Sequence, residues 1–333
     1  MPYVSPSDLS VAAIASFRKL ASSSGRLEPK LLEEPDPVLI EKLKLTEGDY
    51  LKRAAVLLFH DDPERFVTGA FVKIGFFRSE SDLAYHDEVH GDLFTQTAKT
   101  VDLIRTKYLK AAIHYEGLQR IETFPIPYDA LREAVLNALI HRDYAITAPI
   151  QIKVFADCLR IWNPAVLPDG WDLTKLLGSH ASHPFNPDIA NVFFRAGEIE
   201  SWGRGIQRIF EACRASGTPE PKLSISGHDL WTEFPFSPTY LEAIEETSPK
   251  RRNPLVETTP KTTPKTTPKT TPKTTQEKIL ILLTQDPAIG RGALANELGI
   301  SVDGVKYHLN RLRDDGIIKH TGPSRGGHWK VLK

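Results

Sequence analysis

The stretch PYDALREAVLNALIHRDY, residues 127–144, decides the fold. Leucine, alanine, valine and isoleucine surround the helix axis here instead of forming one stripe, which predicts a helix over about 127–142 that is buried nearly all round. Glu133, Asn137 and His141 interrupt it at spacing i, i+4, i+8. At about 100° per residue these three side chains lie within about 80° of arc, on one side of the helix.

A buried carboxylate costs several kcal/mol unless something partners it. The candidates are an internal arginine, ordered water, or a ligand with a metal ion. The alternative without a ligand pairs Glu133 with a neighbouring arginine and lets His141 bond the backbone.

The residues that follow favour a ligand. PIQIKVFADCLRIWNP, residues 149–164, alternates apolar and polar side chains about Ala156 and Asp157, which predicts a β-hairpin ending in a polar turn at Asn163. SWGRGIQRIFEA, residues 201–212, then opens an amphipathic helix with two glycines. Glycines there allow backbone N–H groups to approach a phosphate at the positive end of a helix dipole.

Together these features resemble the ATP-binding domain at the C-terminal end of proteins described as RecG-like helicases or transcriptional regulators. That domain is related to the GHKL ATPases of gyrase, Hsp90, histidine kinases and MutL. The resemblance covers residues 46 to about 236. It is carried by YLKRAAVLLF (50–59), HGDL (90–93), ALREAVLNALIHRDY (130–144), LRIWNPAVLP (159–168) and NPDIANVFFRAGEIESWGRGI (186–206).

The resemblance implies an α+β fold, a GHKL-type (Bergerat-like) α/β sandwich, with ATP and Mg²⁺ as cofactors. Glu133 matches the carboxylate that orients or deprotonates the attacking water in hydrolysing members, and is the candidate catalytic residue. Asn137 matches the amide that ligates Mg²⁺, the candidate metal ligand. Asn163 stands where many members have an aspartate that accepts a hydrogen bond from the adenine amino group.

The remaining cofactor-binding candidates follow from the same resemblance: His141 and the glycine box Gly203, Arg204 and Gly205. The span from Ala165 to Trp202 would be the lid over the nucleotide. The family usually has glycine where this chain has Ala165, and arginine where it has Phe185. These departures support nucleotide binding better than turnover.

A helicase motor of the RecG type requires the P-loop G-x-x-x-x-G-K-[ST], and no such string occurs in the 333 residues. The chain is therefore not a P-loop helicase. Relatives often begin with a Schlafen/AlbA-like nucleic-acid-binding domain, and this sequence starts at about the point where that domain would end. We expect either a shorter variant or a fragment.

Composition is that of a globular protein, with 41% hydrophobic and 25% charged residues. The only two cysteines cannot form a disulfide framework, which favours a reducing compartment. No apolar run approaches the ~20 residues that cross a bilayer, and no signal-peptide pattern opens the chain. We expect a cytoplasmic protein without membrane contact.

The zero net charge conceals an asymmetry. Residues 247–275 carry seven Lys and Arg against one Glu, and residues 276–333 carry nine against six Asp and Glu. Residues 1–246 are therefore acidic, which points to the basic end as the part that meets a polyanion.

Four parts are expected from these patterns: an N-terminal helical lead-in (1–45), the ATP-binding body (46–240), a linker (241–275) and a C-terminal domain (276–333). The linker contains PKTTPKTTPKTTPKTT, residues 260–275, which has no side chain to build a core and predicts a semi-stiff, extended tether.

Residues 276–333 resemble the winged helix-turn-helix domains of bacterial transcriptional regulators. QEKILILLTQ and RGALANELGI predict the first two helices, SVDGVKYHLNRLRDDG the third, with Val305, Leu309 and Leu312 toward the core, and the last residues two strands around a wing. In that family the third helix enters the major groove and the wing contacts the backbone or minor groove. The DNA-binding candidates are Ser301, Val302, Lys306, Tyr307, Asn310, Arg311 and Arg325. A winged helix used only for protein contacts is the alternative.

The sequence thus predicts a transcriptional regulator that binds double-stranded DNA and ATP, acting as a homodimer because one modestly basic reader binds weakly. Two alternatives stay open: an ATPase in DNA repair or phage defence, and a regulator whose nucleotide pocket is degenerate.

Overall fold

The computed structural model describes residues 1, 3–200, 202–247, 279–280, 282–284, 286–287, 289–298, 305, 308–309, 312–313, 317–321 and 328–332. The chain divides into two compact units, Met1–Arg252 and Asn253–Lys333.

A six-stranded mixed sheet forms the centre of the first unit, in the order β4-β3-β7-β8-β10-β9. Only the β3–β7 pair is parallel among these strands; the other neighbours are antiparallel. In register, Ile74 lies beside Ile152, Ile152 beside Ile161, and Ile161 beside Thr232. The strands of this sheet are β3 (Val72–Ser79), β4 (Asp82–Val89), β7 (Ile150–Val154), β8 (Cys158–Pro164), β9 (Lys222–Ser226) and β10 (Asp229–Pro235).

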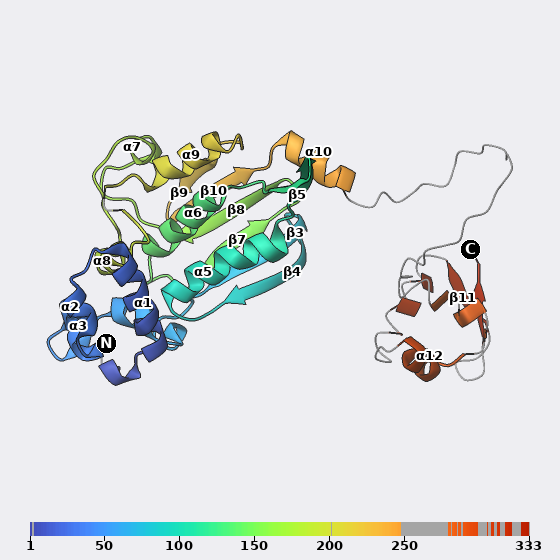
Figure 1. Cartoon of the computed structure of the whole chain (residues 1–333), viewed down its shortest axis with the longest axis horizontal. Coiled ribbons are helices and arrows are strands. Elements are labelled where there is room, and N and C mark those ends of the chain that lie inside the picture. The colour runs from blue at the N-terminus through green and yellow to red at the C-terminus, as the bar shows by residue number, and fades with distance from the viewer. Residues whose placement is uncertain are drawn as a thin grey trace. The chain divides into compact units, whose positions relative to one another are not determined.

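Helices cover one face of this sheet (Figure 1). α6 packs against α5, α9 and β8 and is the central helix of this layer. The helices of the first unit are α1 (Val11–Ser24), α2 (Pro29–Glu33), α3 (Asp36–Lys42), α4 (Arg53–Phe59), α5 (Leu93–Leu103), α6 (Tyr128–Ile140), α7 (Leu173–Leu177), α8 (Pro187–Arg195), α9 (Gly205–Ala215) and α10 (Pro238–Thr247).

Two short two-stranded sheets complete the unit, β1 (Thr46–Glu47) with β2 (Tyr50–Leu51) and β5 (Ala112–Glu116) with β6 (Gln119–Thr123). The N-terminal helices share the core of the body: Phe17 is fully buried and its ring meets Phe59 edge-on at 5.6 Å. Arg26, just after α1, donates to the carbonyls of Phe194 in α8 and of Ile199 beyond it, which ties the end of α1 to this part of the chain.

The strand alternation predicted for residues 149–164 decides which side chains reach the helices. β7 and β8 pair antiparallel around Phe155–Asp157. Leu159, Ile161 and Asn163 lie on the buried face, whereas Arg160 and Trp162, between them, are only half-buried. Asn163 is therefore carried into the layer between the sheet and α6 by the period of two.

The second unit has its own small core. Val305, Leu309 and Leu312 are buried in it, as predicted, together with Ile279, Leu283, Leu294, Ala295 and Ile318. The second predicted helix is present as α12 (Arg291–Leu298), and the two wing strands as β11 (Ile318–Thr321) and β12 (His328–Val331), paired antiparallel.

All seven DNA-binding candidates lie outside the described residues. They are Ser301, Val302, Lys306, Tyr307, Asn310, Arg311 and Arg325. No helix in the described part of the chain is long and apolar enough to cross a membrane.

Candidate functional site

A cavity lies between α6, the strands β8 to β10, the start of α9 and the connecting segment 165–202, which contains α7 and α8. The space inside it is about 1170 Å³ when the solvent at its mouth is included, and about 130 Å³ of this is open to the centres of water-sized spheres. The structure brings all seven predicted nucleotide-site residues to the lining of this cavity: Glu133, Asn137, His141, Asn163, Gly203, Arg204 and Gly205.

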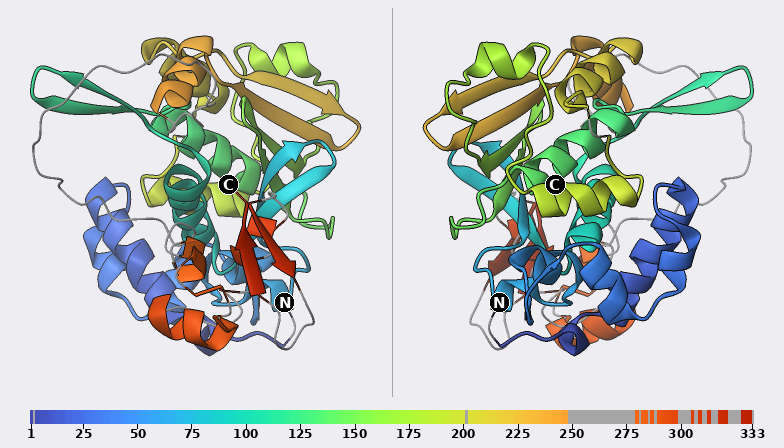
Figure 2. Two further views of the ribbon diagram at one scale, coloured as in Figure 1. Left: turned by 90° about the vertical axis from the view of Figure 1, so that its right-hand side faces the viewer. Right: turned by 90° about the vertical axis from the view of Figure 1, so that its left-hand side faces the viewer.

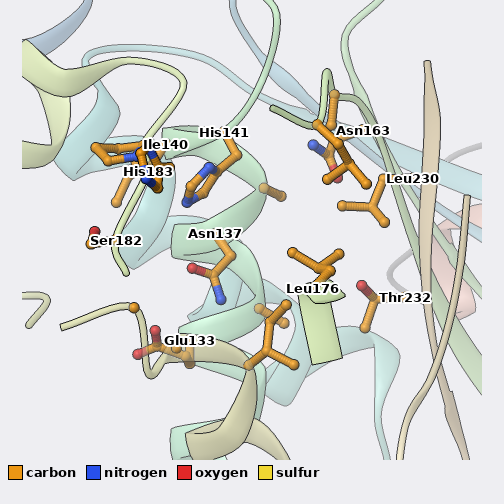
Figure 3. Close-up of a pocket in the computed structure, with 18 of the residues that line it drawn as sticks. Glu133, Asn137, Ile140, His141, Asn163, Leu176, Ser182, His183, Leu230 and Thr232 are labelled. Atoms are coloured by element: carbon orange, nitrogen blue, oxygen red, sulfur yellow. The ribbon is translucent and has the colours of Figure 1, made fainter. Parts of the chain in front are cut away.

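Helix α6 supplies the first three of these residues. Glu133 and Asn137 are one turn apart, and His141 follows as the C-cap, because the helix ends at Ile140 and not at residue 142 as predicted. Figure 3 shows the side chains of all three along one side of the cavity.

Glu133 is a buried carboxylate without a partner. Its exposure is 8%, and among the described residues it forms no hydrogen bond or ion pair. Two arginines stand near, but Arg132 pairs with Glu198 and Arg208 with Glu200. Burial raises the pKa of Glu133, against a smaller lowering effect of Arg208 and Arg132. The pairing with a neighbouring arginine that the sequence left open is not present.

Two amide groups are also unsatisfied. Nδ2 of Asn137 and Nδ2 of Asn163 are both buried and have no hydrogen-bond partner in the part of the chain that the structure describes. Asn163 lies across the cavity from Glu133, next to Leu230 (Figure 3). Buried polar groups are almost always hydrogen-bonded, so unpaired ones that face a cavity mark where a ligand's polar atoms fit.

The lining around Asn163 is otherwise mainly apolar. Ile161, Leu223 and Leu230 come from the sheet, and Val166 and Leu176 from the connecting segment. A flat apolar group with a hydrogen-bonding edge suits this end, whereas the end at Glu133 is polar.

The two glycines predicted to open a helix differ from each other in backbone conformation. α9 begins at Gly205, two residues later than predicted, and Gly203 before it has φ +67°. A Cβ at Gly205 would lie 2.7 Å from Oε1 of Glu133 and 3.1 Å from side-chain atoms of Asn137. The start of α9 therefore approaches the acid and the amide closely only because residue 205 has no side chain.

Gly203 is in contact with the connecting segment. A Cβ there would lie 2.7 Å from the carbonyl oxygen of His180 and 3.0 Å from the amide nitrogen of Ser182. Gln207 adds a hydrogen bond to the carbonyl of Gly178 at 2.8 Å. Residues 178–182 thus pack directly on the start of α9.

An aromatic cluster packs within the same segment. The Trp171 ring meets His180 at 4.7 Å and His183 at 5.7 Å, and Lys175 lies 5.1 Å from its centroid.

Burial, with a smaller effect of His180, lowers the pKa of His141 to about 4. The ring of His141 is therefore neutral at pH 7.

Two further positions near the site have clear structural roles. Asn186 donates Nδ2 to the carbonyls of Ile140 and Arg142, both at 2.8 Å, so it caps the end of α6. Ala165 has no positive φ, so its Cβ is accommodated without strain.

Sequence reasoning missed Trp171, Gln207 and the capping role of Asn186. Only Asn186 carried a signal, as the asparagine of an Asn-Pro pair that starts a helix. The partners of all three lie far along the chain or in an irregular segment, where periodicity gives no guide.

Residues 147–234 match the family described as "Putative ATP-dependent DNA helicase recG C-terminal" (HATPase_c_4), and residues 273–319 match "Winged helix-turn-helix DNA-binding". The chain thus carries a RecG C-terminal-type HATPase domain followed by a winged helix-turn-helix domain, as the sequence predicted.

Among solved structures, the chain is similar to the DIP2311 protein from Corynebacterium diphtheriae, with a TM-score of 0.57 and 20% identity. The match covers 99% of this chain and 63% of that one, so this chain spans less than two thirds of its length. At this identity the likeness concerns the fold alone. No curated protein matches the sequence.

Proposed function

We propose that this chain is a DNA-binding transcriptional regulator whose GHKL-like body binds ATP with Mg²⁺ and whose winged helix reads double-stranded DNA. The proposal rests on one observation above others. A carboxylate and two amides line one cavity. Among the described residues, Glu133 forms no hydrogen bond or ion pair, and Nδ2 of Asn137 and Nδ2 of Asn163 are buried without a hydrogen-bond partner.

The polar side chains of the cavity suit a nucleotide bound together with its metal ion. Asn137 presents an amide oxygen that can ligate Mg²⁺, and Glu133 a carboxylate that can orient or deprotonate an attacking water, both beside the N-terminus of α9. Bound there, Mg²⁺ would offset the charge of the phosphates. Asn163 would pair with the edge of the base between Ile161 and Leu230.

The first test is calorimetry of the full chain with Mg-ATP. We expect binding, and a stabilisation of about 2.7 kcal/mol at a hundredfold excess over Kd. Asn163→Ala should weaken binding at least tenfold, because the base loses its hydrogen bond. Asn191→Ala is the matched control, since Asn191 lies on α8 and its Oδ1 only accepts from Arg195 at 3.3 Å. Absence of both heat and thermal stabilisation would point to the degenerate pocket.

A second candidate function, ATP hydrolysis, is favoured by the raised pKa of Glu133. A carboxylate whose pKa lies closer to neutrality is a better proton acceptor for an attacking water. Steady-state phosphate release that disappears in Glu133→Gln, while Mg-ATP binding persists, would support the ATPase. If the unmodified chain binds Mg-ATP but releases no phosphate, the ATPase is excluded and the nucleotide-binding regulator remains.

A further inference from the structure

The hairpin of β5 and β6 leaves the body as an arm. It belongs to neither the six-stranded sheet nor any larger one, and Figure 2 shows it projecting away from the helices and strands of the body. Its base is held by β5 against α10 and by Tyr240, which donates to the carbonyl of Lys110 at 2.6 Å. Packing on α10 supports the base of this two-stranded hairpin, and among the described residues no further strand lies beside it.

The outer edge of β6 is open. Glu116 pairs with Gln119 across the two-residue turn at Gly117, whose φ of +62° suits a type II′ hairpin. Because the residues that flank such a turn exchange both hydrogen bonds and the pattern alternates, Gln119, Ile121 and Thr123 bond toward β5. Arg120 and Glu122 therefore direct their backbone N–H and C=O groups outward. No other strand of the described residues pairs with them.

The side chains on this edge are complementary to themselves. Arg120 and Glu122 lie on one face of β6 and form an ion pair at 2.6 Å, with side chains 53% and 45% exposed. A second β6 aligned antiparallel about Ile121 places Arg120 of each copy opposite Glu122 of the other. In this register each Arg120–Glu122 pair between the copies is a backbone hydrogen-bonded pair. Ile121 of one copy then lies opposite Ile121 of the other, on the opposite face of the sheet.

The turn supports this register as well. Leu118 is fully exposed at the tip. Antiparallel alignment about Ile121 brings it toward Phe124 of the second copy, whose ring carries the Arg105 guanidinium at 4.0 Å. A leucine that is otherwise in water would then pack on an aromatic ring.

We propose that β6 is the surface through which two copies of this chain pair, joining their arms into a four-stranded antiparallel sheet around a two-fold axis. The proposal does not depend on nucleotide binding, because none of its residues lines the cavity.

Charge reversal tests the pairing. Arg120→Glu places a carboxylate opposite Glu122 of the other copy, and Glu122→Arg places two cations opposite each other. We expect sedimentation equilibrium of the full chain to show a dimer, and each single variant to dimerise at least tenfold more weakly, with the loss reduced at high salt. The double variant Arg120→Glu/Glu122→Arg should recover the dimer.

Mixing the two single variants gives the sharpest result. One then carries two acids at the edge and the other two bases, so they should form a heterodimer although neither dimerises well alone. This outcome also shows that both hairpins are folded, as should unchanged circular dichroism and melting temperature. A monomeric unmodified chain, single variants that dimerise normally, or a mixture that stays monomeric would each overturn the proposal.

Discussion

At the scale of the residue, Gly205 offers the cleanest separation of folding from binding. Its φ is not positive, so alanine is accommodated by the backbone and suits the start of a helix. The added methyl would nevertheless lie 2.7 Å from Glu133 Oε1. We expect Gly205→Ala to fold with a melting temperature within a few degrees of the unmodified chain and to lose Mg-ATP binding by at least tenfold in calorimetry.

The control for this variant is Gly290→Ala, where a Cβ meets nothing within 4 Å. It should change neither property. Full affinity in Gly205→Ala would mean that the ligand does not enter between α9 and α6.

His141 makes stability depend on pH. Its pKa is about 4 in the fold and about 6.5 in the unfolded chain, so between these values the unfolded state binds more protons. Stability is therefore lost as pH falls from 6.5 to 4, by roughly 2–3 kcal/mol. The pKa of Glu133 is raised and acts in the opposite sense.

Urea denaturation of the full chain and of His141→Gln at several pH values isolates this effect. The difference in the free energy of unfolding between the unmodified chain and His141→Gln should shrink or reverse steadily as pH falls from 6.5 to 4, because glutamine does not titrate. Parallel curves would show that the ring of His141 is not shielded from water.

The residues of the site were predictable where one element's period fixed them. Helical spacing placed Glu133 and Asn137 together. The role of Asn163 came only from the resemblance, and in the structure strand alternation carries this residue inward. The bond from Gln207 to Gly178 and the double cap by Asn186 join segments that only the completed fold brings together. No local pattern encodes such pairs.

At the scale of the element, the connecting segment 165–202 packs on the start of α9 at Gly203. Any side chain there meets the backbone of His180 and Ser182 and also occupies a left-handed φ, which costs about 1–2 kcal/mol. We expect Gly203→Ala to release residues 178–182 from α9. Hydrogen exchange should then rise in this segment, with little change in α5 or β7.

Loosening of the segment should also speed nucleotide release, which stopped-flow displacement measures. Gln207→Ala removes a single hydrogen bond from the same contact and should produce a weaker version of both effects. An unchanged exchange rate in Gly203→Ala would mean that the segment does not rest on the glycine.

Elements with a clear period were predicted better than their connections. α6, the β7–β8 hairpin, α9 and α12 lie within about two residues of the predicted positions. After Gly91, α5 ends at Leu103 and a π-helical turn, Ile104–Tyr108, follows, for which the sequence offers no local signal. The parallel β3–β7 pair joins strands some 70 residues apart, and no local signal gives that contact.

At the scale of the whole molecule, the charge is divided between an acidic body and a basic end. Phosphate contacts dominate affinity for DNA and each adds to its salt dependence. The body therefore contributes little to binding, and removal of residues 276–333 should abolish retention on duplex DNA in a gel-shift assay at physiological salt. A body that binds equally well would show that the winged helix is not the reader.

The linker, with seven Lys and Arg against one Glu, must be separated from the reader. A chain ending at residue 275 keeps these charges, and one ending at residue 246 does not. If only the longer of these two truncated chains binds DNA weakly, that binding gives the contribution of the linker. In the full chain, Lys306→Ala with Arg311→Ala should lower the slope of log K against log salt by about 1.8 if both contact phosphates. An affinity loss with an unchanged slope would instead assign them to base edges, since a contact to a base releases no counterion. Burial of Val305, Leu309 and Leu312 shows which side of the third helix faces the core, but not which residues on its other side contact DNA bases or phosphates. The salt slope decides between these two kinds of contact.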